Sequence, residues 1–531
     1  MMNQKKLRGI ALVLTILLVF TFSGCAKAPV TTENEDNVEE KATKEKVLII
    51  GYDRDPETLD HIRTSWYSDS LIYIFDRLVS RDYNFNYKPG IAESWETSDD
   101  GLTWTFHLRN NVKFHDGKPL TANDVKWTID TIKNPDTASP FAADLEAIKE
   151  IVVKNDHTVD IILNYSFPNL LFNLSNTASG IASKEAYEQY GTEYGSKYVV
   201  GSGPYIFKEW IKGDRIVIEK NHDYNWGPEW MSNRGPALID KIVLRTIPEE
   251  NSRIMELETG GVHILRNVPA TFFDQLKGNS DIEVIQGDAT KLGYLAYPCD
   301  KKPFTDLKVR QAINHAINKK DIIEYVFRGL AKEAHGYLPS ALKDEYYEES
   351  EKDSYKYDIE RAKELLSEAG YKDGLKLTLS SDNATESVRL AEVLQNQLKD
   401  VGIDAEIRLY DSASYTAMLK EGTQELFLRL YSWPNADILD WFLLSSQYPY
   451  PNHSRWEDKK TDELLIGAAQ KPTWEERAVG YKEAQKHLIE QAVWAPIYIP
   501  DNLIATRKEV KNFKYHPWML QFNDGFDLEV E

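Results

Sequence analysis

The chain has 531 residues, and 84 acidic against 63 basic side chains give it a formal net charge of −21. So acidic a chain repels the phosphates of nucleic acids, which argues against nucleic-acid binding. The two cysteines, Cys25 and Cys299, are too few for a disulfide framework or a cysteine-based metal site, and the length predicts about three lobes in place of one core.

The first residues are typical of an export signal. Basic side chains within residues 5–8 precede a largely apolar run, residues 10–22, which is too short to span a bilayer. Small residues then lead directly to Cys25, the position where lipidation needs a thiol. We therefore predict a lipoprotein signal peptide over residues 1–24 and a lipidated Cys25. An ordinary secretory signal with an incidental cysteine is the alternative.

The next segment, residues 25–46, is polar and charged and lacks the periodicity of a helix or strand. Such a segment cannot bury enough apolar surface to fold, so we expect a disordered tether. Together with two or more acyl chains on Cys25, the tether would hold the protein at the extracytoplasmic face of the cell membrane. We expect no further membrane anchor, because no later run is long enough to span a bilayer.

Residues 89–130 carry the clearest local signals of the chain. Residues 103–108 alternate between apolar and polar side chains, which predicts a half-buried strand. Asp-Gly pairs on both sides of this region predict turns. Thr121, followed three residues later by Asp124, predicts an N-cap and the start of a helix.

Further along, three helices carry their own start or stop signals. Asp306 is placed to cap a helix whose apolar residues share one face. Residues 358–370 and 385–402 each end in a glycine, the residue that best tolerates the left-handed conformation after a helix.

Residues 94–125, SWETSDDGLTWTFHLRNNVKFHDGKPLTANDV, closely resemble the signature of the extracellular solute-binding proteins of peptide-type ABC importers. That family is known for dipeptide-, oligopeptide- and nickel-binding members. Residues 201–205, GSGPY, and residues 303–323, PFTDLKVRQAINHAINKKDII, resemble two other segments of the same family.

The resemblance implies an α/β, two-lobed periplasmic-binding-protein type II fold with an extra third subdomain. The two lobes are expected to close on a solute and then dock on the membrane subunits of an ABC permease. The expected division of the folded part is residues 47–80 for the first part of lobe I, 81–199 for the extra subdomain, 200–288 for the second part of lobe I, 289–501 for lobe II and 502–531 for the return to lobe I.

The aromatic-rich residues 428–456 contain most of the expected ligand site. In peptide-binding relatives a W-x-x-D pattern here supplies an aspartate that pairs with the ligand's amine, since a buried ammonium needs a carboxylate partner. In this chain Asp437 stands four residues after Trp433 instead of three, so Asp440 is the other candidate for the anchor. Trp433 would stack on the ligand or form a wall of the cleft, and Tyr431 completes this group.

A second part of the expected site follows the first strand. Residues 52–60 resemble a family segment that lies beside the cleft, which makes Tyr52 and Asp53 candidate binding residues. Residues 70–79, SLIYIFDRLV, then resemble a helical family segment and are expected to form a buried helix.

We therefore expect a monomeric binding protein for peptides that has no catalytic residues, cofactor or metal. Oligosaccharides and nickel chelates are the alternative ligands within the family. A lipid-anchored hydrolase is the alternative of a different class, because Ser340 and Lys343 fit an S-x-x-K nucleophile pattern, although its partner motifs are absent. A purely structural surface protein is the third possibility.

Overall fold

The computed structural model describes residues 45–64, 69–83, 85–342, 354–471, 474–518 and 527–531. The expected signal peptide, Cys25 and nearly all of the tether lie outside these residues, as does Lys343. Residues 45–531 form one compact unit. None of the described helices is long and apolar enough to cross a membrane.

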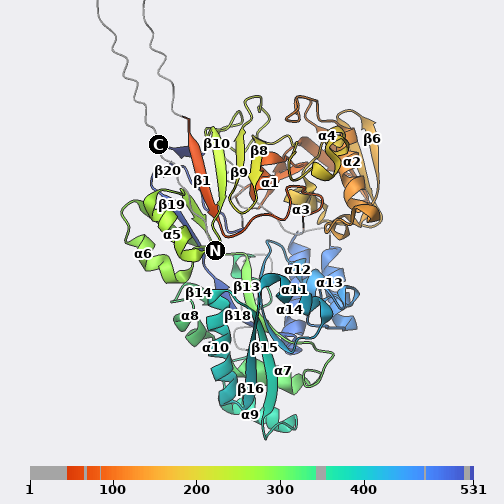
Figure 1. Cartoon of the computed structure of the whole chain (residues 1–531). Helices are drawn as coiled ribbons and strands as arrows, with labels where there is room; N and C mark the ends of the chain where they lie inside the picture. Colours follow the sequence, from red (N-terminus) through yellow and green to blue (C-terminus); the bar gives the residue numbers. More distant parts are fainter. Residues whose placement is uncertain (1–44, 65–68, 84, 343–353, 472–473, 519–526) are drawn as a thin grey trace, which may run out of the picture. The chain divides into compact units, whose positions relative to one another are not determined.

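A mixed sheet of seven strands, which we call the first sheet, includes the first described strand of the chain (Figure 1). In that strand Leu48 and Ile50 are fully buried, and the strand pairs in parallel with a neighbour on each side. Three helices pack on this sheet, namely α1 (Asp69–Ile74), α5 (Glu250–Thr259) and α6 (Phe273–Lys277). The strand order is β12 (Ile282–Gly287), β19 (Asn502–Arg507), β11 (Ile264–Arg266), β1 (Val47–Tyr52), β10 (Lys241–Thr246), β9 (Arg215–Lys220) and β8 (Tyr205–Ile211).

A sheet of six strands, the second sheet, lies within the largest apolar core of the chain. Its strand order is β14 (Ala331–Glu333), β18 (Trp494–Pro500), β13 (Lys291–Ala296), β17 (Leu426–Ser432), β15 (Leu375–Asp382) and β16 (Ile403–Tyr410). Its helices are α7 (Leu307–Ala316), α8 (Lys319–Tyr325), α9 (Ile359–Glu368), α10 (Thr385–Asp400), α11 (Ser412–Glu421), α12 (Ile438–Leu443), α13 (Lys459–Ala469) and α14 (Trp474–Glu490).

The helix signals read from the sequence in this region are confirmed. Asp306 caps α7, and Gly370 and Gly402 follow α9 and α10 with positive φ angles of 88° and 92°.

A third sheet, of four antiparallel strands, has its own apolar core. The alternating residues 103–108 form a strand, and Thr121 and Asp124 form a reciprocal capping box at the start of a helix, so both predictions are confirmed. The strand order is β4 (Ala92–Thr97), β5 (Thr103–Leu108), β7 (Thr158–Leu163) and β6 (Ile148–Asn155). The helices of this part are α2 (Ala122–Lys133), α3 (Leu170–Leu174) and α4 (Lys184–Tyr190).

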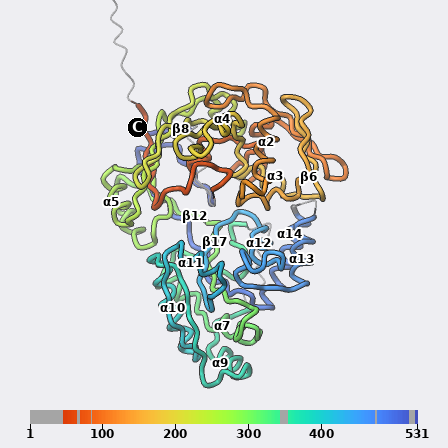
Figure 2. The backbone as a smooth tube through the Cα atoms, turned by 45° about the vertical axis from the view of Figure 1, so that its right-hand side comes forward, coloured from red at the N-terminus to blue at the C-terminus, as the bar shows by residue number. Residues whose placement is uncertain are grey.

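The chain passes between the first and second sheets twice, at residues 288–290 and again at residue 501. Figures 1 and 2 show that α3 of the third-sheet region faces the side of the second-sheet region that carries α12 and α14, whereas α5 of the first-sheet region lies over the opposite side, which carries α10. Two short strand pairs complete the fold: β2 (Val79–Arg81) with β3 (Tyr87–Pro89), and β20 (Val510–Lys511) with β21 (Glu529–Val530). The α/β class is confirmed, and the lobe boundaries drawn from the sequence stay a prediction.

The expected helix over residues 70–79 is wrong in its second half. Helix α1 ends at Ile74, and Val79 already belongs to strand β2. The carbonyl of Ile74 accepts a hydrogen bond from Gly203 N–H at 2.8 Å, and carbonyls further on bond to residues 91 and 92. Long-range backbone partners therefore replace the helical ones, and a sequence pattern cannot reveal such partners.

Candidate ligand-binding site

The end of strand β17 brings an aromatic side chain against the third-sheet region. Trp433 follows the strand directly, and its backbone N–H donates to Thr290 O at 2.9 Å. Its ring contacts Phe172 of α3 with centroids 5.6 Å apart and Trp518 with centroids 6.1 Å apart. Trp433 therefore lies where the second sheet, the third-sheet region and the C-terminal segment meet.

Asp437 lies in the same place, at the start of α12, and both of its carboxylate oxygens accept hydrogen bonds. One accepts from Trp433 Nε1 at 2.6 Å, and the other accepts from Asn169 Nδ2 at 3.2 Å. Asn435 Nδ2 in turn donates to Asn169 Oδ1 at 3.4 Å. These bonds join the second sheet to α3. Burial raises the pKa of Asp437 to about 6, although the Trp433 hydrogen bond opposes this shift.

Two more carboxyl groups gather around Asp437. Asp440 Oδ2 accepts from Tyr481 OH at 2.9 Å, while its Oδ1 is buried and has no hydrogen-bond partner among the residues that the structure describes. Burial, together with the charge of Asp437, raises the pKa of Asp440 well above its usual range and that of Asp144 to about 7. Arg477 partly offsets this concentration of negative charge, because it lowers the pKa of both Asp437 and Asp440.

Tyr431, the fourth predicted residue of this segment, lies in the core. Its ring is buried against Tyr294 and Phe442, and its hydroxyl donates to Tyr337 O at 2.6 Å. Tyr431 therefore stands two residues before Trp433 in the chain, but its side chain takes no part in the contacts of Trp433 and Asp437.

Tyr52 at the end of β1 is linked to this region, whereas Asp53 stands apart. Tyr52 OH donates to Asp69 Oδ2 at 3.0 Å, and Asp69 forms an ion pair with Arg266. Arg266 also donates to the backbone oxygen of Trp518 at 3.2 Å, which connects this network to the ring that contacts Trp433. Asp53 is exposed and makes no hydrogen bond or ion pair with the residues that the structure describes.

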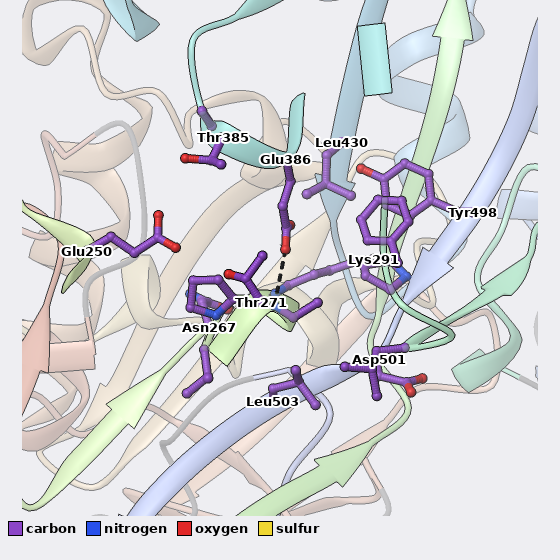
Figure 3. A pocket seen from close by; sticks show the side chains of 17 residues that line it. Glu250, Asn267, Thr271, Lys291, Thr385, Glu386, Leu430, Tyr498, Asp501 and Leu503 are labelled. Carbon is purple, nitrogen blue, oxygen red and sulfur yellow. Dashed lines mark hydrogen bonds between the residues drawn. The ribbon is translucent and has the colours of Figure 1, made fainter. Parts of the chain in front are cut away.

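A pocket of about 200 Å³ lies between the first and second sheets, and none of the sequence motifs predicted it. It contains Lys291, the first residue of strand β13, and Glu386 in the first turn of α10 (Figure 3). Lys291, a lysine among apolar strand residues, was a weak sequence signal for this pocket. Glu386 was no signal, because acidic residues are generally preferred in the first turn of a helix. The lining residues are Glu250, Asn267, Val268, Pro269, Ala270, Thr271, Lys291, Phe327, Leu330, Ala384, Thr385, Glu386, Leu430, Tyr498, Pro500, Asp501 and Leu503.

Other chemistry finds little support in the part of the chain that the structure describes. That part holds no cluster of three or more His, Cys, Asp or Glu side chains that could bind a metal. Cys299 is buried, and burial raises the pKa of its thiol to about 12. Ser340 Oγ is buried and makes no hydrogen bond with the described residues, and its proposed partner Lys343 lies outside them.

A solved structure defines the class of protein. The ABC transporter-associated periplasmic binding protein DppA from Helicobacter pylori, in complex with the peptide STSA, matches with a TM-score of 0.81 at 28% sequence identity. The match covers 91% of this chain and 98% of that one. The fold is therefore the multi-lobed, mixed α/β fold of type II periplasmic binding proteins, as expected.

Sequence comparisons give the family. The model of the bacterial extracellular solute-binding proteins, family 5 (middle part), matches residues 86–450. Glutathione-binding protein GsiB of Salmonella choleraesuis is 30% identical over 86% of this chain and 88% of its own length, and heme-binding protein A of Haemophilus influenzae is 29% identical over 85% and 86%. The chain belongs to the family 5 extracellular solute-binding proteins. Members of this family serve ABC importers as binding proteins and are not enzymes.

Proposed function

We propose that this protein captures extracellular di- and oligopeptides and delivers them to the membrane subunits of an ABC permease. The interface of Trp433 and Asp437 with Asn169 and Phe172 carries the proposal. Side chains from the second-sheet region and from α3 of the third-sheet region meet there through a direct hydrogen bond and a ring contact. A solute enclosed beside such an interface would favour the closed arrangement, because a ligand shifts a conformational equilibrium by its stronger binding to one state.

The choice of peptides over other solutes rests on the relatives. GsiB is a glutathione-binding protein, and glutathione is a tripeptide, while the matched DppA structure holds the peptide STSA. Heme-binding protein A stands at nearly the same identity, so a measurement of the bound ligand's mass separates these two ligand classes.

Trp433, Asp437, Asp440, Tyr52, Asp53 and Tyr431 are the candidate binding residues carried over from the sequence. Among them, Trp433 and the carboxylates of Asp437 and Asp440 have the chemistry that a peptide needs, namely an aromatic face and an acceptor for an ammonium group. Asp437 could accept a ligand amine only beside or in place of the donors that it already has.

We also propose that the protein is a lipoprotein held at the extracytoplasmic face of the membrane by Cys25 and the tether of residues 25–46. The support is the order of basic, apolar and small residues before Cys25. In cells, the Cys25→Ser protein should move from the membrane fraction to the soluble fraction. A membrane-bound Cys25→Ser protein would contradict the lipid anchor.

Native mass spectrometry of the purified protein tests the ligand class, because it weighs the protein together with any ligand that co-purifies. A peptide mass is expected, and a carbohydrate or a metal chelate would overturn the peptide proposal. Incubation with the same peptide separates a binding protein from the alternative hydrolase. The binding protein should leave the peptide intact after many equivalents, whereas a hydrolase would produce fragments.

A further inference from the structure

The pocket between the first and second sheets holds two side chains of opposite charge that do not pair with each other. Figure 3 shows Lys291 and Glu386 reaching into the middle of the pocket, the first from β13 and the second from the start of α10. In the described chain no carboxylate oxygen lies within 4.0 Å of Lys291 Nζ, so the two residues are not a structural ion pair. Both side chains are half-buried, and a charge withdrawn from water without an opposite partner costs folding free energy, which makes this arrangement informative.

Lys291 keeps most of its hydrogen-bonding capacity free. Its ammonium has three N–H donors, and within the described chain only one is used, in a 2.8 Å bond to Asn267 Oδ1. Burial and the nearby charge of Arg266 lower the pKa of Lys291 to about 8, while Glu386 opposes this shift. Lys291 is therefore still mainly a cation near neutral pH, and a bound anion would stabilise it.

Glu386 likewise uses little of its hydrogen-bonding capacity. Its Oε1 accepts one long hydrogen bond, from Ala270 N–H at 3.4 Å, and it makes no other hydrogen bond or ion pair with the described residues. A carboxylate can accept about four. Burial and the nearby charge of Glu250 raise the pKa of Glu386, although Ala270 N–H and Lys291 lower it in part. A bound cation would remove the cost of keeping this carboxylate charged.

The size and the paired charges of the pocket select the ligand class. A volume of about 200 Å³ has room for several waters, and therefore for the charged end groups of a small polar molecule. A simple anion would leave Glu386 unmatched, and a simple cation would leave Lys291 unmatched. A molecule with both an ammonium and a carboxylate group matches both poles.

We propose that this pocket receives the charged ends of a short peptide, with Lys291 binding the terminal carboxylate and Glu386 binding the terminal ammonium. The inference rests on the proposed function and names the groups that read the ligand. Lys291 belongs to strand β13 of the second sheet and Glu386 to helix α10, which packs on that sheet, while their present partners, Asn267 and Ala270, belong to the segment after β11 of the first sheet. A peptide held there contacts both sheets at once, so its binding draws them together.

Calorimetric titration with alanine peptides of two to five residues tests this assignment, using each peptide free, N-acetylated and C-amidated. The wild type should prefer the free peptides by about tenfold or more over either blocked form. Glu386→Gln should remove the preference against N-acetylation and leave the effect of amidation. Lys291→Gln should do the opposite.

Glu392→Gln and Lys376→Gln are matched controls, since both residues are exposed, the first on α10 and the second on the neighbouring strand β15. Neither control should change the preferences. Asp437→Ala tests the rival assignment, in which Asp437 binds the ligand amine. In that case this substitution would abolish the preference against N-acetylation. That result, or an intact preference in both pocket variants, would overturn the inference and leave a peptide-binding protein. Failure of every peptide form to bind the wild type would overturn the proposed function itself.

Discussion

The hydrogen bonds of Asn169 offer a direct way to measure what holds the second sheet against the third-sheet region. Asn169 Nδ2 donates to Asp437 at 3.2 Å, and its Oδ1 accepts from Asn435 at 3.4 Å. Asn169→Ala removes both bonds and leaves all other contacts of Asp437 with Trp433 in place. If the two parts separate when ligand leaves, the substitution destabilises only the closed form.

The expected loss of ligand affinity in Asn169→Ala follows from the charge of the hydrogen-bond acceptor, Asp437. With a pKa of about 6, Asp437 is mainly ionised at pH 7.5, and a hydrogen bond to a charged group contributes about 1.5–3 kcal/mol. The second bond is longer and joins neutral groups, so we assign it little. A loss of about 2 kcal/mol from the closed form weakens apparent ligand affinity roughly thirtyfold, since 1.4 kcal/mol corresponds to a factor of ten.

Calorimetric titration with the peptide identified by native mass spectrometry gives the affinity, and small-angle X-ray scattering with and without peptide follows closure. Asn173→Ala is the matched control, because Asn173 on the same helix bonds to the backbone of Asp144 within its own region. It should lower stability without changing affinity. An unchanged affinity in Asn169→Ala, with a closed form that still assembles, would refute the reasoning.

Three further predictions concern stability and reactivity. Asp144→Asn should stabilise the protein by on the order of 4 kcal/mol above pH 7, because the raised pKa means that the folded state disfavours the charged carboxyl. Thermal unfolding should show this gain vanish as pH falls from about 7 towards 3.8. Gly201→Ala should cost about 3 kcal/mol or more in chemical unfolding, since the added Cβ would lie 2.0 Å from Ile74 O, whereas Gly467→Ala meets nothing within 4 Å on helix α13 and should gain about 1 kcal/mol. The thiol of Cys299 should not react with Ellman's reagent at pH 8 until the protein is unfolded, and rapid reaction of the native protein would show that the site opens.

Two buried histidines change the stability of the protein in the same pH range as Asp144, and in the opposite direction. Burial lowers the pKa of His61 and of His115 to about 4. Each histidine therefore lowers the free energy of unfolding of the protein as pH falls from 6.5 towards 4, because the unfolded state binds the proton more readily. The gain from Asp144 is therefore best read as the difference between wild type and Asp144→Asn at each pH. In that difference the histidine contributions cancel.

The sequence by itself determined the local elements and the family. The alternation of residues 103–108, the capping pair of Thr121 and Asp124, and the glycines after α9 and α10 act over a few residues, so each predicted its element correctly. The length and distinctive motifs of residues 94–125 were enough to identify the family. These signals depend on short-range geometry, which the linear chain displays.

Only the tertiary structure decided what depends on residues far apart in the chain. Helix α1 stops at Ile74, whose carbonyl accepts a hydrogen bond from Gly203 N–H. Tyr431 is a core residue whose hydroxyl donates a hydrogen bond to the backbone oxygen of Tyr337. The bonds between Asp437 and Asn169 bridge 268 positions of sequence. The pocket of Lys291 and Glu386 forms where strands from two sheets and the start of a helix converge. Burial and the neighbouring charges give these groups their properties, and both arise only when the chain folds.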